Sequence, residues 1–230
     1  MLGIHASKIR GSIGGNTFVA GRTAGIVIRA KSVPTGNVSS YRNTIQSAFA
    51  TFKSLWPQIS QTYRYYWDAY AKTLKFSSSI GSHVPTGRSV AMQQYIKSVF
   101  VDSIPGYSLS GGPSLAPPLQ TGRLAINRFR INPTGTPSGR IRLFIQNTNS
   151  EPVAAVAVRS VAFNPSRTSR PGSFDPSTYL VYNIPSNDSI VFTWSNLKPG
   201  ASYFIRFYLL SQLPGRRCSN VYKVHAHAVL

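Results

Sequence analysis

The second half of the chain alternates between short apolar runs and turn residues. Pro, Gly and Asn separate seven such runs, at residues 123–131, 140–146, 153–162, 178–184, 189–194, 202–210 and 221–229. Short runs of this kind, each ended by turn residues, are typical of the strands of an antiparallel β-sandwich. Within 203–209, alternation predicts that the odd-numbered residues face the core and that Phe204, Arg206 and Tyr208 lie on the other side.

The first half instead spaces its apolar residues at the period of a helix. A first helix is expected to begin near Ser39 and Ser40, whose hydroxyls can cap it, and to end at Pro57. Its apolar face consists of Tyr41, Ile45, Ala48, Phe49, Phe52 and Trp56. A third helix is expected over residues 88–100, with an apolar face of Met92, Tyr95, Ile96, Val99 and Phe100.

A second helix is expected between these two, after Ser60, which can cap its start. Its aromatic residues fall on one face, at Tyr63, Tyr66, Trp67 and Tyr70. This spacing predicts that they pack in the seam of an antiparallel hairpin with the first helix and do not stack on nucleic-acid bases. Arg64 and Tyr65 fall off that face, so they are the better candidates for contacts with a partner.

Residues 8–31 are predicted to form a β-hairpin, with strands at 16–20 and 26–31. Three glycines precede it, but the strand–loop–helix context and the Gly-Lys-Ser/Thr sequence of a phosphate-binding loop are missing. A flexible arm or tight turns are therefore the favoured interpretation. The basic residues of this arm are expected to lie on a phosphate backbone or on a neighbouring subunit, and they are Lys8, Arg10, Arg22, Arg29 and Lys31.

A stretch rich in Pro, Gly and Ser separates the two patterns. It runs over residues 104–120 and is predicted to be a linker. The expected domains are a β-hairpin and helical domain at 1–103 and a β-sandwich domain at 121–230. The predicted fold class is therefore α+β with two domains, a β-hairpin with about three helices followed by an antiparallel β-sandwich.

The composition adds a strong basic charge to this picture. Of 230 residues, 25 are Lys or Arg and 5 are Asp or Glu, so the formal net charge is +20. Residues 1–118 hold 12 basic and 2 acidic residues, and residues 119–230 hold 13 and 3, so each half carries +10. The charge therefore belongs to both predicted domains and not to a basic tail. Such a protein repels itself, which indicates an anionic partner, either nucleic acid or an acidic protein.

The scarcity of acidic residues argues against most enzymes. Paired-carboxylate hydrolysis, two-metal phosphoryl transfer and carboxylate-bound Ca²⁺ all need clustered acids. The lone Cys218 excludes an intrachain disulfide framework and a cysteine-rich zinc site. His225 and His227 are predicted on one face of the last strand, as a surface pair and not as zinc ligands. No enzymatic activity, metal or cofactor is expected.

Arginines recur along the strands and loops of the second half. Because strand neighbours two apart point the same way, Arg128 shares a face with Arg130, and Arg140 shares one with Arg142. Such rows suit backbone phosphates, which arginine's planar fork can contact in pairs, and they carry no base-reading signature. Further candidates for the same contacts are Arg64, Arg167, Arg170, Arg216 and Arg217.

Residues 197–208 resemble the end of a fibronectin type III domain. Residues 197–203 match its Leu-x-Pro-Gly-x-x-Tyr corner, and Ser-Asn at 219–220 precedes the last strand. The resemblance implies an immunoglobulin or fibronectin III-like sandwich in which the corner Tyr hydroxyl bonds the backbone upstream. The chain departs from that family in its long Arg-rich loop at 164–175 and in Trp194, which lies late, just before the corner.

The first hundred residues resemble small, poorly characterised proteins of bacteria and phages. Those proteins begin with a Gly-rich hairpin whose second strand ends in a basic-x-basic pattern before a Pro, here at 29–34. A helical hairpin then ends in an aromatic-Asp/Asn-Ala-Tyr-Ala motif, here Trp-Asp-Ala-Tyr-Ala at 67–71. The phage context of this group implies, by analogy, a component of a virion.

These observations lead to a functional hypothesis. The chain has no run of about 18 apolar residues, so no membrane span is expected, and residues 1–12 lack the apolar core of a secretory signal. The leading hypothesis is a non-enzymatic structural component of a phage or virus particle, oligomeric and assembled in the host cytoplasm. Its basic surface would contact packaged nucleic acid through backbone phosphates, or acidic virion proteins. Two alternatives stay open, a free nucleic-acid-binding protein without sequence preference and a bacterial surface or adhesion module.

Overall fold

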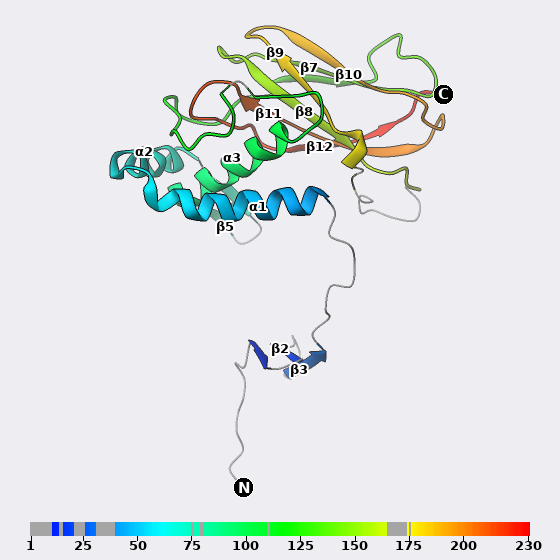
Figure 1. The fold of residues 1–230 in the computed structure, drawn as a ribbon. Coiled ribbons are helices and arrows are strands. Elements are labelled where there is room, and N and C mark those ends of the chain that lie inside the picture. Colours follow the sequence, from blue (N-terminus) through cyan, green and yellow to red (C-terminus); the bar gives the residue numbers. More distant parts are fainter. Residues whose placement is uncertain are drawn as a thin grey trace. The chain divides into compact units, whose positions relative to one another are not determined.

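The structure is a computed structural model that describes residues 11–13, 16–20, 26–30, 40–74, 76–78, 81–109, 111–164, 174 and 176–230. Contacts group the chain into two units, Met1–Ser39 and Ser40–Leu230, and Figure 1 traces both along the sequence. The larger unit holds the helices together with the sandwich. The boundary therefore lies after the N-terminal strands, whereas the sequence analysis placed it between the helices and the sandwich.

The residues described in the first unit form three short strands, which make an antiparallel sheet in the order β1-β2-β3. They are β1 (Gly11–Ile13), β2 (Asn16–Ala20) and β3 (Ile26–Ala30). The β2–β3 pair places Phe18 opposite Ile28. The predicted hairpin is confirmed, and β1 adds a third strand to it.

In the described part of the second unit, three α-helices come first. They are α1 (Ser40–Leu55), α2 (Gln61–Lys72) and α3 (Gly87–Asp102), with a short 3-10 helix η1 (Trp56–Gln58) and a small hairpin of β4 (Phe76–Ser78) and β5 (Gly81–His83). Ser60 Oγ accepts a hydrogen bond from Tyr63 N at 3.2 Å, and Thr86 Oγ1 accepts one from Ser89 N at 3.2 Å. Both α2 and α3 therefore start where a hydroxyl satisfies an amide of the first turn.

Helix α3 is the centre of the helical layer. In Figure 1 it lies between α1 and the sandwich, and it packs against both α1 and α2. Phe52 of α1, Trp67 of α2 and Ala91 of α3 are almost completely buried in the core of this layer. The predicted aromatic core face of α2 is confirmed for Trp67 and Tyr70, which are buried in one cluster with Phe52 of α1, and it is wrong for Tyr63 and Tyr66. Because the Trp67 side of α2 meets α3, Tyr63 and Tyr66 remain 45% and 51% exposed.

Among the residues described after 120, seven strands form two antiparallel sheets, and all seven predicted runs are confirmed as strands. One sheet has the order β10-β7-β6, from β6 (Arg128–Ile131), β7 (Ile141–Gln146) and β10 (Ser189–Trp194). The other has the order β12-β11-β8-β9, from β8 (Val153–Arg159), β9 (Leu180–Ile184), β11 (Ser202–Ser211) and β12 (Tyr222–His227), and a 3-10 helix η2 (Pro176–Thr178) precedes β9. This part of the chain is therefore an antiparallel sandwich of three and four strands.

The four-stranded sheet is covered on one face by the other sheet and on part of its second face by the helices. Ile205, Phe207 and Leu209 of β11 are fully buried in the core shared with the three-stranded sheet, as alternation predicts. On the opposite face, Tyr208 is buried in a cluster with Val101 at the end of α3. The helical layer and the sandwich are therefore joined by an apolar contact.

The segment 104–120, predicted as a linker, packs against its neighbours. Leu109 is 3% exposed in the cluster between α3 and the sheet, and the Trp67 indole Nε1 donates to Leu115 O at 2.9 Å. Pro117 and Pro118 are also buried. The prolines and glycines of this segment thus form its turns, and the segment packs against the protein instead of acting as a linker. Among the described helices, none has the length and apolar character needed to cross a membrane.

Candidate nucleic-acid interface

The outer face of the three-stranded sheet carries the predicted arginine rows. Arg128 and Arg130 of β6 lie opposite Gln146 and Phe144 of β7. In β7 the buried residues alternate with Arg142, Phe144 and Gln146, which are only partly buried. Because neighbouring strand residues face opposite sides, these side chains share the face turned away from the core. Arg140 is exposed directly before β7. We call Arg128, Arg130, Arg140 and Arg142 the arginine face.

The arginine face borders a groove of about 660 Å³. The groove is lined by Asn127, Arg128, Phe129, Arg130, Pro133, Phe144 and Gln146. Arg128 Nη1 donates to Gln146 Oε1 at 3.4 Å, which is long for a hydrogen bond. A guanidinium carries five N–H donors, so Arg128 retains donors for an incoming acceptor.

The chemistry of this face suits phosphate. Guanidinium forks pair with phosphate oxygens through two charge-assisted hydrogen bonds. Apolar neighbours that are only partly buried, such as Phe144, can contact sugar or base. Contacts of this type position a nucleic acid without reading its sequence. These described side chains therefore have the chemistry to hold phosphate groups, and contacts of this kind would not select a base.

Four of the five acidic residues are described, and each one bonds to the protein's own chain. Asp68 Oδ1 accepts from Gly87 N at 3.0 Å, and Asp102 Oδ1 accepts from Leu109 N at 2.9 Å. Asp188 Oδ1 accepts from Ser189 N at 2.7 Å, and Glu151 is in an ion pair with Arg217. Among the described residues this is the one ion pair, so no described carboxylate neutralises the arginine face.

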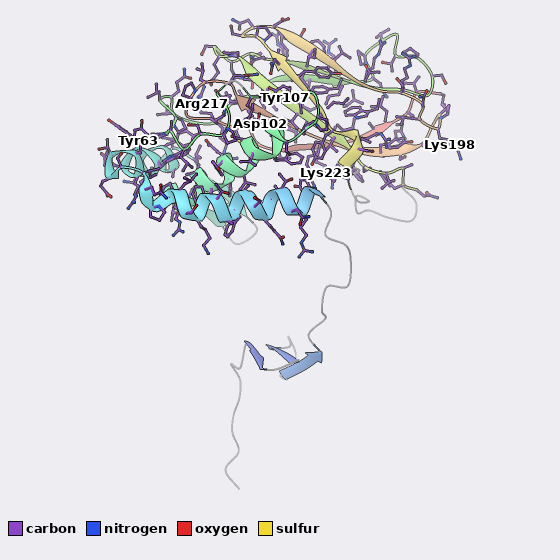
Figure 2. The ribbon with its side chains drawn as sticks, in the orientation of Figure 1. Tyr63, Asp102, Tyr107, Lys198, Arg217 and Lys223 are labelled. Carbon is purple, nitrogen blue, oxygen red and sulfur yellow. The ribbon has the colours of Figure 1, made fainter. Side chains whose placement is uncertain are left out.

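Arg216 and Arg217 were predicted to contact nucleic acid, and the structure contradicts this by burying them to 2% and 8% exposure. Arg216 donates to Ser211 O at 3.0 Å and to Gly112 O at 2.9 Å. Burial lowers its pKa from the usual value. Arg217 donates through Nε to Glu151 Oε1 at 2.9 Å, and Figure 2 labels it near the helical layer. Both arginines hold the 104–121 segment against the sandwich.

The remaining predicted residues divide into two groups. Arg64 is half-buried, and its Nη2 donates to Pro57 O at 2.6 Å, so it ties α2 to the end of η1. Arg29 lies in β3, where the backbone alone is described. The other predicted residues lie outside the described parts of the chain, and they are Lys8, Arg10, Arg22, Lys31, Arg167 and Arg170.

A cavity of about 470 Å³ lies where α2 and α3 meet the sandwich. Lys97 Nζ lies 3.3 Å from Cys218 Sγ and 5.0 Å from the centre of the Tyr208 ring. Burial raises the pKa of Tyr70, which also lines the cavity, to about 12. A phenol of that pKa stays protonated near neutral pH and is a poor base there, so the cavity offers apolar volume more than acid–base chemistry.

The two histidines of β12 lie together, as predicted. The ring centroids of His225 and His227 are 4.5 Å apart. Burial, and to a smaller extent His227, lowers the pKa of His225. Within the described residues, no group of three or more His, Cys, Asp or Glu could hold a metal ion.

Two cations were missing from the residues predicted as sites. Arg206 of β11 and Lys223 of β12 lie opposite each other and are both exposed. The period of two that identified Arg128 and Arg130 also places Lys223 and His225 on one face of their strand, so this part of the surface was predictable from the sequence. The sequence pattern does not show that β11 and β12 pair and so bring Arg206 beside Lys223.

The sequence matches no protein-family model, and no curated protein matches it. Among solved structures, part of the chain is similar to a family 76 glycoside hydrolase from a bovine Bacteroides thetaiotaomicron strain, with 11% identity, 45% of this chain and 20% of the hydrolase covered, and a TM-score of 0.31. It is also similar to the sensor domain of the anti-sigma factor RsgI4 of Pseudobacteroides cellulosolvens, with 15% identity, 44% and 95% covered, and a TM-score of 0.25. A Bifidobacterium adolescentis GH3 beta-glucosidase is similar with 15% identity, 44% and 17% covered, and a TM-score of 0.24. Likeness at this level carries no argument about function.

Proposed function

We propose that this protein is a non-enzymatic structural component of a nucleic-acid-containing particle such as a phage virion, and that its arginine face contacts backbone phosphates. The observation that carries the proposal is the gathering of Arg128, Arg130, Arg140 and Arg142 on one sheet face. The described acidic residues bond within the protein and leave that face unneutralised. A compact unit with this charge is stabilised by an anionic partner.

The sandwich supports a finer assignment, which is part of the same proposal. In an immunoglobulin constant-type domain, the first strand belongs to the four-stranded sheet. Here the first strand, β6, lies in the three-stranded sheet, and β9 pairs with β8 in the other. Gly200, at φ +74°, turns the chain just before β11, whose second residue is the buried Tyr203. These features favour a fibronectin type III-like sandwich.

The test is a salt series of nucleic-acid binding with two variants of equal charge. The first changes Arg128, Arg130, Arg140 and Arg142 to Gln, and the second changes four exposed cations elsewhere, Lys53, Lys72, Arg88 and Lys198, to Gln. On duplex DNA, the logarithm of affinity falls by about 0.9 per phosphate contact for each logarithmic unit of salt. We expect the first variant to lose most of this slope and the second to keep it. Equal losses would show that net charge, and not the arginine face, governs binding.

Whether this protein belongs to such a particle is tested by the protein composition of the particle. Mass spectrometry of purified particles should find this chain, and washing at high salt should leave it in place, because apolar contacts persist when charges are screened. Release at high salt would favour a free nucleic-acid-binding protein. Absence from the particles would overturn the structural role.

A further inference from the structure

A second cationic surface lies on the four-stranded sheet, next to the part that the helices cover. Across β11 and β12, Phe204 is paired with His225 and Arg206 is paired with Lys223. Tyr208, two residues beyond Arg206, is buried under the end of α3. The helices therefore cover one part of this face, while Arg206, Lys223 and His225 remain exposed and Phe204 is half-buried.

Aromatic rings form a continuous step on this surface. Phe163 stacks on Phe204 with ring centroids 4.6 Å apart and an interplanar angle of 6°. The His225 ring lies against both, at centroid distances of 5.4 Å and 5.5 Å, and His227 follows it. Phe163 is half-buried and His225 is exposed, so the outer rings of the step are open to a ligand.

Cations flank these rings on the same face. Lys223 Nζ lies 4.5 Å from the centre of the Phe204 ring, and Arg206 Cζ lies 4.1 Å from that of Phe174. Neither cation is paired with a described carboxylate, because the one ion pair of the described residues joins Arg217 to Glu151. The surface thus combines ring faces with unneutralised positive charge, which complements a polyanion whose bases are free to stack.

We propose that the surface formed by Phe163, Phe204, Arg206, Lys223 and His225 binds single-stranded nucleic acid. Bases stack on the outer rings, and Arg206 and Lys223 contact the phosphates between them. In a duplex the base faces are already stacked on one another, so this surface selects unpaired strands, whereas the arginine face accepts either form. The inference rests on the proposed function and names the form of nucleic acid for which this surface is built.

Fluorescence anisotropy with the full chain tests this surface. Labelled oligothymidine of about 15 nucleotides is compared with an abasic strand of the same length, which has the same phosphates and no bases. Wild type is expected to bind the oligothymidine about tenfold more tightly, the effect of one stacked base. Phe163→Leu and His225→Ala should each reduce this preference and leave the abasic affinity unchanged. Phe163→Tyr keeps the ring and should keep the preference.

The control is Tyr65→Ala, which removes an exposed ring from α2, 67% exposed, and should leave the preference intact. If wild type binds both strands equally, the stacking surface is wrong while the proposed function stands. If wild type binds neither strand, the proposed function itself fails. Loss of the preference in Tyr65→Ala, with no loss in His225→Ala, would move the stacking site to α2 and overturn the inference.

Discussion

Two groups of arginines in the same sandwich differ in their exposure to solvent. Arg216 and Arg217 are buried at the junction with the 104–121 segment, where carbonyl oxygens and Glu151 accept their hydrogen bonds. Arg128 and Arg130, on the outer sheet, are exposed and lie beside a groove. Both groups are local Arg pairs in sequence, so residue type alone does not distinguish a structural arginine from one that meets a partner. The distinction lies in whether an acceptor within the protein is already in place.

The largest effect is expected from removing the buried cation. Arg217→Met leaves Glu151, 3% exposed, as a buried charge without its ion-pair partner, and the free energy of unfolding should fall by about 3–5 kcal/mol. Urea denaturation measures this loss. Arg130→Met, which removes an exposed arginine instead of a buried one, is the control and should change the free energy of unfolding by less than about 0.5 kcal/mol. Similar values for the two variants would remove the distinction between the groups.

A double variant separates charge from shape at the same place. Arg217→Met with Glu151→Gln removes both charges, so a large part of the lost stability should return. If the double variant is as unstable as the single one, the hydrogen bonds of Arg217 to Thr121 and Gln120 matter more than the ion pair.

The buried parts are also expected to be sensitive to added volume. A Cβ at Gly87 would lie 2.4 Å from Asp68 Oδ1 and 2.6 Å from Asp68 N, and the backbone atom cannot move aside easily. Gly87→Ala should therefore destabilise the protein by about 1–3 kcal/mol, measured as a lower midpoint of thermal unfolding. Gly135→Ala is a poor control because Gly135 has a positive φ, so Ser89→Ala on the same helix serves instead. A Gly87→Ala midpoint no lower than that of Ser89→Ala would show that α2 and α3 can separate at little cost.

On the arginine face, a single change should affect binding and spare the fold. Arg130→Ala is expected to weaken nucleic-acid binding several-fold and to reduce the salt slope by about 0.9, while the unfolding midpoint stays the same. The measurement is a salt series by filter binding. A normal slope with a lower midpoint would place Arg130 with the structural arginines.

The smallest effect concerns pH. Burial and His227 lower the pKa of His225 below 6.5, so the folded protein holds this proton less readily than the unfolded chain does. Stability from the neutral ring is therefore present at high pH and is lost as the pH falls through about 6.5, the unfolded value, towards the folded pKa. His225→Gln should lose less stability than wild type between about pH 7.5 and about pH 5 in urea titrations. Equal losses in both proteins would contradict the shifted pKa.

Much of the fold was predictable because its signals are local. The seven apolar runs became seven strands, since each run and its turn residues lie within about ten positions. Ser60 caps α2 as expected, because a capping hydroxyl needs only the next three residues. The arginine face followed from the same local period of two along β6 and β7.

The errors come from contacts distant in sequence. Arg217 is buried because Glu151, 66 residues away, reaches its Nε. Tyr63 and Tyr66 were expected in a core, but α2 packs on α3 and not on the helix before it, so their side stays exposed. The second cationic surface needed the pairing of Arg206 with Lys223 across two strands. Each of these outcomes depends on which elements meet, and local periodicity does not contain that information.

The burial of β8 limits how this protein can be divided by evolution or by cloning. Six of its seven residues are buried, with Ala155 and Ala157 turned to the opposite sheet and Ala154 and Val156 to the cluster beneath α3. Many sandwich domains are inherited and recombined as independent modules. If this sandwich were expressed without its helices, it would expose an apolar patch that favours aggregation. The smallest fragment that keeps both faces of β8 covered is therefore the whole unit Ser40–Leu230.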